Sequence, residues 1–452
     1  MHEILPIEFD LFRLYELNPE RYPFLLESVA HGTLQSRYDI LFAFPQETLR
    51  LHADATLEGP DDCLRDNFIS SFNRWFLQEQ SSSDEDTILP YRGGWFIYLA
   101  YELASEIETS LVLPQTKDKQ SIAYAARCPA AIIRDHEKKI TYLFAEKGHE
   151  DLIQGLQKDV NEISDTVAES DDFQISLSQI IEEEPRKYCR AVERIKKYII
   201  EGDVFQVNLS RLWKAKLDEQ ITSADVYKKL RINNPAPFAC FARLPDMTII
   251  SSSPERLVSI KDRVVETRPI AGTRPRSDDL AEDMRLADEL LAHPKEQAEH
   301  IMLIDLERND LGRVCQPGTI QVDELMVLES FTHVHHIVSN VRGVLRDNVT
   351  PIDVIKAVFP GGTITGCPKV RCMEIVAELE QQPRGAYTGS VGYINRDGSM
   401  DTNILIRTLI KSNDEISFRA GAGIVYDSDP QRELDETRAK ALGLLRALSV
   451  EN

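Results

Sequence analysis

The sequence has little of what marks membrane, secreted or nucleic-acid-binding proteins. No stretch approaches the ~18 apolar residues of a membrane span, and the acidic N-terminal residues lack the basic and apolar regions of a secretory signal. The seven cysteines are scattered without a C-x-x-C pair, which indicates neither a disulfide framework nor a zinc ribbon. Basic residues are outnumbered, 52 Lys and Arg against 74 Asp and Glu, and a net charge of −22 disfavours phosphate backbones and anionic lipids. We therefore expect a cytoplasmic protein with neither a nucleic-acid nor a membrane partner.

The composition is that of a globular protein with a sizeable core, since 42% of the 452 residues are hydrophobic. Strand-like stretches separated by turn residues fill 34–60 and 120–145, so the first third is expected to be rich in sheet. The polar, acidic stretch at 146–185 indicates a helix followed by a solvated connection. We place a boundary there and predict two regions, residues 1–180 and 181–452, or one continuous domain.

The second region alternates helical and strand-like patterns. A helical period at 186–201 ends at Gly202, and an alternating strand follows directly. Further helical periods occur at 279–292, 295–309 and 432–448. Strands are expected between them at SVGYINRD, NILIRTLI and ISFRAGAGIVY. The pattern predicts a large mixed α+β architecture.

Three carboxylates are candidates for a metal site. Glu433 and Glu436 stand three residues apart on one face of the terminal helical period, and Glu299 lies on another helical period. Convergence of these groups would suit a hard, oxygen-ligated ion such as Mg²⁺. An ordinary exposed acidic helix turn fits Glu433 and Glu436 equally, because sequence spacing does not show convergence.

The glycine-rich segments do not indicate nucleotide binding. Residues 361–369 lack the G-K-[ST] ending of a P-loop, and 421–423 lack the third glycine of a dinucleotide fingerprint. Backbone N–H groups of Gly421, Ala422 and Gly423 suit binding of a carboxylate, whereas a bulge or tight turn is the alternative.

A histidine cluster and one arginine remain as candidates. His333 and His335 share one face of a strand and His336 the other, with no further ligand at zinc spacing, so a single proton-carrying or core histidine is favoured over zinc. Arg407 interrupts an apolar strand and is either paired with a buried carboxylate or directed at an anionic ligand.

Ten motifs in consistent order resemble the chorismate-utilising enzymes, a family that includes the large subunits of anthranilate synthase and aminodeoxychorismate synthase, isochorismate synthase and salicylate synthase. The motifs are GDVFQVNLS (202–210), SSPER (252–256), RPIAGTRPR (268–276), AEHIMLIDLERNDLGRV (298–314), HHIVS (335–339), GGTITGCPKVRCMEI (361–375), GAYTGSVGYI (385–394), DTNILIRT (401–408), AGAGIVYDSDP (420–430) and ELDETRAKA (433–441). Residues 1–150 resemble the amino-transferring members more loosely. The resemblance implies the family fold, two sheets with helices packed outside, and chorismate as the substrate.

The resemblance also implies roles for individual residues. It suggests Glu299 and Glu436 as Mg²⁺ ligands, with Glu433 acting through water. It suggests that Tyr387, Arg407 and the backbone of Gly421, Ala422 and Gly423 hold the enolpyruvyl carboxylate. Glu255 resembles the general acid that protonates the leaving hydroxyl, and His336 and Thr363 correspond to contacts with the ring side of the substrate. A carboxylic acid serves as this acid near neutral pH only if its surroundings raise its pKa.

Gln206 stands where water-activating members of the family have a lysine. Glutamine does not act as a general base near neutral pH and suits ammonia as the nucleophile. No cysteine lies in a G-x-C-x-G segment with a matching His-x-Glu, so we expect ammonia to come from a separate glutamine amidotransferase subunit.

The motifs resemble two kinds of family member, which add the amino group at different positions of chorismate. QVNLS, VHH and GCPKVRC resemble the large subunit of aminodeoxychorismate synthase, which we favour, in 4-aminobenzoate and folate synthesis. Its best-known members carry a lysine that forms a covalent adduct, where this sequence has Ala271, as anthranilate synthases do. Anthranilate synthase therefore stays open, as does a non-catalytic relative that binds chorismate or tryptophan.

The N-terminal motifs LLES (25–28) and SRYDI (36–40) resemble a tryptophan pocket, with Glu27, Ser28 and Ser36 as candidate lining residues. Helix-capping or buried polar roles fit Glu27 and Ser28 equally well.

Overall fold

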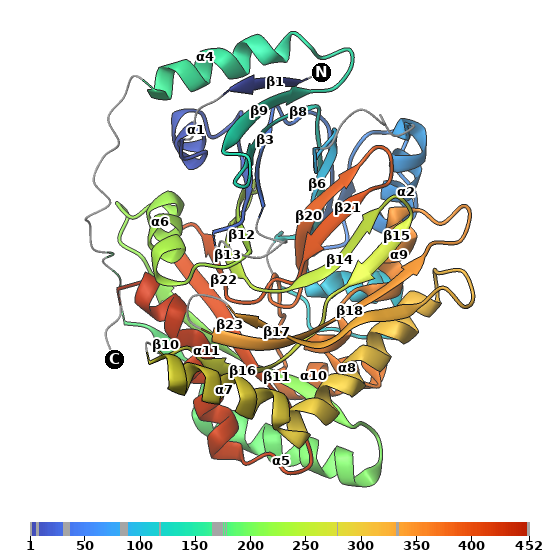
Figure 1. Ribbon diagram of the computed structural model, residues 1–452, viewed down its shortest axis with the longest axis vertical. Helices are drawn as coiled ribbons and strands as arrows, with labels where there is room; N and C mark the ends of the chain where they lie inside the picture. Colours follow the sequence, from blue (N-terminus) through green and yellow to red (C-terminus); the bar gives the residue numbers. More distant parts are fainter. Residues whose placement is uncertain are drawn as a thin grey trace.

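Two large antiparallel sheets dominate the protein, and most helices lie around their outside (Figure 1). The computed structural model describes residues 2–5, 9–29, 37–81, 89–116, 119–164, 175, 177, 179–277, 279–330 and 334–449. Across these ranges the sheets contain twelve and eleven strands. The predicted α+β architecture of two sheets with helices packed outside is confirmed.

The first sheet joins strands from the two ends of the chain. Its order is β1 (His2–Leu5), β9 (Ile140–Ala145), β8 (Ala130–Asp135), β3 (Tyr38–Ala43), β2 (Phe24–Glu27), β12 (Phe238–Arg243), β13 (Thr248–Ser253), β22 (Thr408–Ser412), β23 (Glu415–Ile424), β11 (Gln206–Lys216) and β10 (Ile181–Glu182), with β19 (Gly366–Cys367) also paired to β11.

The second sheet is built in the same way. Its order is β16 (Ile270–Pro275), β18 (Val334–Val344), β15 (Val264–Thr267), β14 (Arg256–Lys261), β21 (Met400–Asn403), β20 (Ser390–Asn395), β6 (Gly94–Leu99), β7 (Ser121–Cys128), β4 (Thr48–His52) and β5 (Leu57–Glu58), and β17 (Gln321–Ser330) pairs with β18. Segments from both sides of residue 180 contribute to each sheet, because β2 pairs with β12 and β6 pairs with β20.

The helices of the described residues are α1 (Phe12–Leu17), α2 (Phe68–Glu79), α3 (Ala104–Ile107), α4 (Leu152–Ser164), α5 (Pro185–Glu201), α6 (Ser223–Asn233), α7 (Leu280–Ala292), α8 (Pro294–Gly312), α9 (Pro351–Val358), α10 (Lys369–Glu380) and α11 (Pro430–Ala447), with short 3₁₀ turns η1 (Tyr101–Leu103) and η2 (Gly362–Ile364). Of these, α4, α5, α7, α8 and α11 lie where the sequence predicts helices, and the other six were not predicted. As predicted, α5 ends at Gly202, whose φ of 85° is the left-handed conformation that glycine adopts without strain. Among the described helices, none combines the length and apolarity needed to cross a bilayer.

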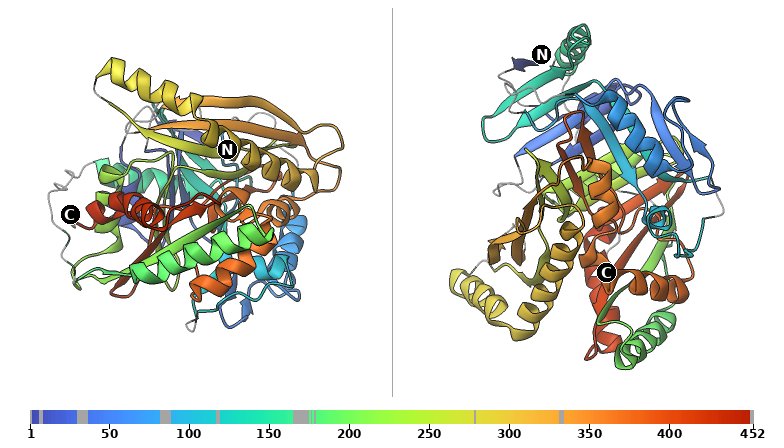
Figure 2. Two further views of the ribbon diagram at one scale, coloured as in Figure 1. Left: turned by 90° about the horizontal axis from the view of Figure 1, so that it is seen from below. Right: turned by 90° about the vertical axis from the view of Figure 1, so that its right-hand side faces the viewer.

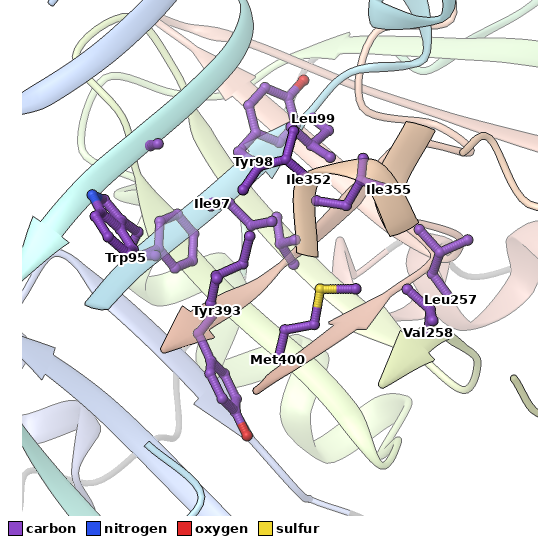
Figure 3. Packing of buried hydrophobic residues seen from close by; sticks show 14 of the residues in the cluster. Trp95, Ile97, Tyr98, Leu99, Leu257, Val258, Ile352, Ile355, Tyr393 and Met400 are labelled. Carbon is purple, nitrogen blue, oxygen red and sulfur yellow. The ribbon is translucent and has the colours of Figure 1, made fainter. Parts of the chain in front are cut away.

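The main core fills the space where the two sheets face each other. Phe24 of the first sheet stacks on Phe96 of the second, with ring centroids 4.1 Å apart. Side chains of β6, β14, β20, β21 and α9 pack together in the same cluster (Figure 3). Figure 1 and the right-hand view of Figure 2 show α5, α7, α8, α10 and α11 toward the end of the molecule away from the N-terminus.

The segment NILIRTLI is not the single strand that its apolar pattern predicts. Strand β21 of the second sheet ends at Asn403, and β22 of the first sheet begins at Thr408. The chain crosses between the sheets in the intervening residues, and Arg407 has a left-handed φ of 52° there. The pattern is misleading because the crossing is itself largely buried, so it stays apolar without being a strand.

Phe96→Ala tests the packing of one sheet on the other. Removing a ring buried between the sheets leaves a cavity, and we expect the free energy of unfolding to fall by about 3–5 kcal/mol in urea denaturation. The control Leu77→Ala removes a side chain that is 53% exposed, and its effect should stay within about 0.5 kcal/mol. Similar losses for the two variants would contradict this account of the core.

Candidate active site

Glu255 is a buried carboxyl group at the start of the second sheet. It lies in the short connection between β13 and β14, immediately before the first residue of β14. Its backbone carbonyl accepts a hydrogen bond of 3.0 Å from the Ile404 amide. Thr363 of η2 donates its hydroxyl to Oε1 of Glu255 at 2.8 Å. Burial raises the pKa of Glu255 to about 7, against the lowering effects of the Thr363 hydrogen bond and of the Lys440 and Arg407 charges. A substantial fraction of this group therefore carries a proton at neutral pH, as a general acid requires.

Arg407 stands at the crossing between the sheets, close enough to Glu255 for their charges to interact. Its carbonyl accepts a hydrogen bond of 3.1 Å from the Ser252 amide, which anchors the left-handed turn. Its guanidinium forms no ion pair or hydrogen bond with any described residue, and burial lowers its pKa. Of the two interpretations left open by the sequence, a salt bridge to a buried carboxylate is therefore not observed. A desolvated guanidinium without a partner is costly, and an anionic ligand would remove that cost.

His336 lies near the same guanidinium. Its Nδ1 is 3.0 Å from the Thr273 hydroxyl and 3.3 Å from the Gly272 carbonyl oxygen. Burial lowers its pKa to about 4, and the Arg407 charge acts in the same direction, so His336 is neutral at pH 7. Ala271 precedes Gly272 on β16 and packs with Leu303 and Leu306 of α8.

His335 faces the opposite side of β18 from His336, as the strand alternation predicts. Its Nε2 lies 3.0 Å from Asp283 Oδ1 and its Nδ1 2.7 Å from the Ser330 hydroxyl, so its ring is held by a structural network. His333 lies outside the described residues. Within the described ranges there is no group of three or more His, Cys, Asp or Glu side chains placed to hold a metal ion.

The Gly421–Ala422–Gly423 segment is an unbroken part of β23, so the bulge or tight turn considered from the sequence is wrong. Its residues pair in regular register with Ser210, Leu209 and Asn208 of β11. Glycine is required by close neighbours. A Cβ at Gly421 would lie 2.6 Å from the Tyr387 hydroxyl oxygen, and a Cβ at Gly423 would lie 2.3 Å from Gln206 Nε2. Tyr387 and Gln206 thus cover this stretch of strand.

The backbone of the glycine segment presents polar groups on the side away from β11. The Gly421 carbonyl accepts a hydrogen bond of 3.0 Å from Lys440 of α11. The N–H of a strand residue points the same way as its C=O, so the amides of Gly421 and, two residues on, Gly423 also point away from β11. On β11, Gln206 Oε1 and Asn208 Oδ1 are buried acceptors without a donor among the described residues. The region therefore offers both N–H donors and unsatisfied oxygens to a ligand.

The three predicted acidic residues lie on helices α8 and α11, and the charge of Glu436 acts on the other two. Burial is the largest cause of the raised pKa of Glu299, and the charge of Glu436 on the other helix adds to it. The pKa of Glu433 is likewise raised by burial and then by Glu436. Two lysines lie among these carboxylates, with Lys295 Nζ 3.8 Å from Glu299 and Lys440 Nζ 2.8 Å from Glu436. Carboxylate oxygens are hard donors of the kind that Mg²⁺ prefers, whereas the described side chains do not stand close enough together to form a group of three or more that could hold a metal ion.

The charges link the separate parts into one site. Lys440 contacts both Glu436 and the Gly421 carbonyl, and its charge acts on Glu255. Glu255 in turn interacts with Arg407, which acts on His336. The residues that the sequence analysis missed are Lys440, Lys295 and Asn208. Lys440 stands four residues after Glu436, a helical spacing that would have placed it on the same face.

A separate cavity of about 930 Å³ lies between the sheets, next to Arg256. Its lining includes Glu27, Ser28, Phe238 and Arg256, and Arg256 forms an ion pair of 2.8 Å with Asp401. Tyr227 donates its hydroxyl to Glu27, and burial raises the Glu27 pKa to about 7. Two of the three residues predicted for a second pocket thus line one cavity, and Ser36 falls outside the described residues.

Comparisons with known proteins place the chain in a family. A family model described as chorismate binding enzyme matches residues 23–446. An anthranilate synthase component I-like protein of Synechocystis is 44% identical over 363 residues, 80% of this chain and 73% of that protein. Aminodeoxychorismate synthase component 1 of Bacillus subtilis is 38% identical over 441 residues, 94% of this chain and 91% of that protein. The crystal structure of anthranilate synthase component I from Streptococcus pneumoniae has a TM-score of 0.81 at 32% identity and covers 92% of this chain and 93% of that one. The matched span includes every element that contributes to the site.

Proposed function

Because this chain belongs to the family of chorismate-binding enzymes, we propose that it is the synthase component of an aminodeoxychorismate synthase. It would convert chorismate and ammonia to 4-amino-4-deoxychorismate, the precursor of 4-aminobenzoate in folate synthesis. The observation that carries the proposal is the unpaired Arg407 guanidinium beside a protonatable Glu255. Together they form an anion-binding position next to a proton donor.

Substrate binding is assigned to the groups that surround Arg407. Chorismate is a dianion, and the protein carries a net charge of −22, so the site must attract anions locally. Arg407 suits the enolpyruvyl carboxylate, and the N–H groups of Gly421 and Gly423 with the Tyr387 hydroxyl suit its remaining oxygens. His336 and Thr363 would contact the ring.

Amination requires a proton donor for the departing hydroxyl group and hydrogen-bond acceptors that hold the ammonia nucleophile. Glu255 would protonate the departing 4-hydroxyl, which leaves as water. The unsatisfied oxygens of Gln206 and Asn208 suit the N–H groups of ammonia. Neither amide abstracts a proton near neutral pH, which favours ammonia over water as the nucleophile. The ammonia is assigned to a separate glutamine amidotransferase subunit, since the sequence has no cysteine in a G-x-C-x-G segment.

Mg²⁺ is the proposed cofactor. Glu299 and Glu436 would hold it directly and Glu433 through water. When bound, the ion supplies a Lewis acid that neutralises the ring carboxylate of the substrate. The side chains of α8 and α11 would thus fix the end of chorismate opposite Arg407.

Amination at C2, as in anthranilate synthase, is the second candidate. Ala271 favours it, because this position carries a buried methyl group packed on α8 and offers no nucleophile for a covalent adduct. The relatives divide in the same way, with both synthase names among them.

Product analysis distinguishes the candidates. The protein is incubated with chorismate, Mg²⁺ and ammonium, with and without a lyase that releases 4-aminobenzoate. We expect chorismate consumption, with 4-aminobenzoate appearing only when the lyase is added. Fluorescence of 2-aminobenzoate without the lyase would assign amination to C2, and no consumption of chorismate would contradict the enzymatic function.

Glu436→Gln tests the proposed metal ligand. Replacing a charged ligand by a neutral amide should raise the Mg²⁺ concentration that gives half-maximal activity by roughly 10–100-fold. Substitution of a residue that only hydrogen-bonds to a metal ligand already weakens metal binding by this amount. The matched control is Asp435→Asn, which removes a neighbouring exposed carboxylate on α11 and should leave the Mg²⁺ requirement unchanged. Equal Mg²⁺ dependence in both variants would remove Glu436 from the ligand set.

We also propose tryptophan as the ligand of the 930 Å³ cavity. The carboxylate of Glu27 suits an α-amino group, and Phe238 provides an apolar wall. Calorimetry should detect tryptophan binding, and Glu27→Gln should weaken it about tenfold or more by removing a charge-assisted hydrogen bond. Glu20→Gln, at an exposed carboxylate, serves as the control. Unchanged affinity in Glu27→Gln would exclude this mode of binding.

A further inference from the structure

Glu307 is a second buried carboxyl group beneath the candidate site. It lies on α8 and is 5% exposed. No Lys, Arg or His forms an ion pair with it within the described part of the chain. The polar and charged groups that act on it are Asp310 of its own helix, Lys369 of α10, Thr267 of β15 and Glu255. An unpaired carboxyl in such surroundings stays neutral near pH 7, because ionisation without a counter-charge is costly.

Glu307 and Glu255 lie on either side of one short segment. Thr363 donates its hydrogen bond of 2.8 Å to Glu255 Oε1. The preceding residue, Gly362, approaches Glu307 so closely that a Cβ there would lie 3.7 Å from Glu307 Oε1. Burial, and then the Asp310 charge, raise the pKa of Glu307 to about 8, and the Glu255 charge acts in the same direction. Protonation of one carboxyl group therefore favours ionisation of the other.

A connection toward solvent begins one turn further along α8. Asp310 stands three residues after Glu307, and its carboxylate forms an ion pair of 2.5 Å with Lys369. The two side chains are 12% and 14% exposed. Glu255 and Glu307 are thus both buried, at 6% and 5% exposed, and the Asp310–Lys369 ion pair is the more exposed group of the series.

We propose that Glu307 holds a proton beneath Glu255 and returns it to the Glu255 carboxylate after each turnover, with the Asp310–Lys369 pair as the route from solvent. Glu307 touches no substrate and acts only through Glu255, so it is a positioning residue. The inference rests on the proposed role of Glu255 as the general acid.

The step balances without any further reactant. Ammonia forms the new C–N bond, and the breaking C–O bond leaves its electron pair on oxygen, which takes the Glu255 proton and departs as water. The new ammonium group releases one proton to solvent. Glu255 then takes the Glu307 proton, and Glu307 takes one from solvent, so that no net proton is consumed.

Glu307→Gln removes the proton supply while keeping the shape of the side chain. The first turnover should be nearly unaffected, because Glu255 begins partly protonated, and later turnovers should slow about tenfold or more. Rapid mixing with chorismate should therefore give a burst of consumption in this variant, with KM within about twofold of the parent value. Glu307→Asp should restore part of the steady rate. Asp305→Asn, which removes an exposed carboxylate from the same helix, should show no burst.

An equal slowing of the first and later turnovers, or an unchanged kcat, in Glu307→Gln would overturn the proposal while leaving the proposed function intact. If the parent protein consumes no chorismate, the proposed function fails instead.

A measurement without substrate tests the proton reservoir separately. The infrared difference spectrum between the parent protein and Glu307→Gln at pH 7 should contain one protonated carboxyl band, assigned to Glu307, and the difference spectrum with Asp305→Asn should lack it. The band of Glu307 should also titrate differently in Glu255→Gln, because its neighbour has lost its charge. Absence of this band from the difference spectrum with Glu307→Gln, or no change in its titration in Glu255→Gln, would overturn the inference.

Discussion

The site depends on the passage of the chain from one sheet to the other between β21 and β22. At this crossing the Arg407 carbonyl bonds to Ser252 at the end of β13, and the Ile404 amide bonds to the Glu255 carbonyl. The guanidinium and the buried acid are therefore attached to the same short, hydrogen-bonded junction. The packing of the two sheets sets the separation between the Arg407 guanidinium and the Glu255 carboxyl group. The cation and the proton donor therefore lie near each other without forming an ion pair.

Burial then determines the chemistry of these groups. The same desolvation raises the pKa of Glu255 and Glu307 and lowers that of His336 and Arg407. One low-dielectric environment therefore favours the protonated form of the two carboxyl groups and the neutral form of the imidazole. The same environment surrounds the Arg407 guanidinium, which has no partner. The surface of the protein is strongly acidic, so the few cations near the site, Arg407, Lys440 and Lys295, carry the local attraction for an anionic substrate.

The candidate active site and the cavity between the sheets share a single stretch of backbone. Glu255 belongs to the candidate active site, and the adjacent Arg256 lines the cavity between the sheets. Successive residues of an extended chain point to opposite sides. A ligand that shifts Arg256 or its partner Asp401 would act on the peptide that carries the proposed acid. The cavity and the site are thus neighbours through the main chain.

From the sequence alone, apolar periodicity predicted helices α4, α5, α7, α8 and α11, a part of the strands and the α+β class, because such patterns are local properties of the chain. The candidate site residues came from the resemblance carried by the ten ordered motifs. The Gly202 helix end is one such feature, since its left-handed geometry needs only that residue. Only the tertiary structure decided that NILIRTLI is two strands in different sheets, that the Gly421–Gly423 segment is a regular strand, and that Arg407 has no salt bridge. Those outcomes depend on contacts between residues distant in the chain, as do the pKa values of Glu255 and Glu307, for which burial is the cause.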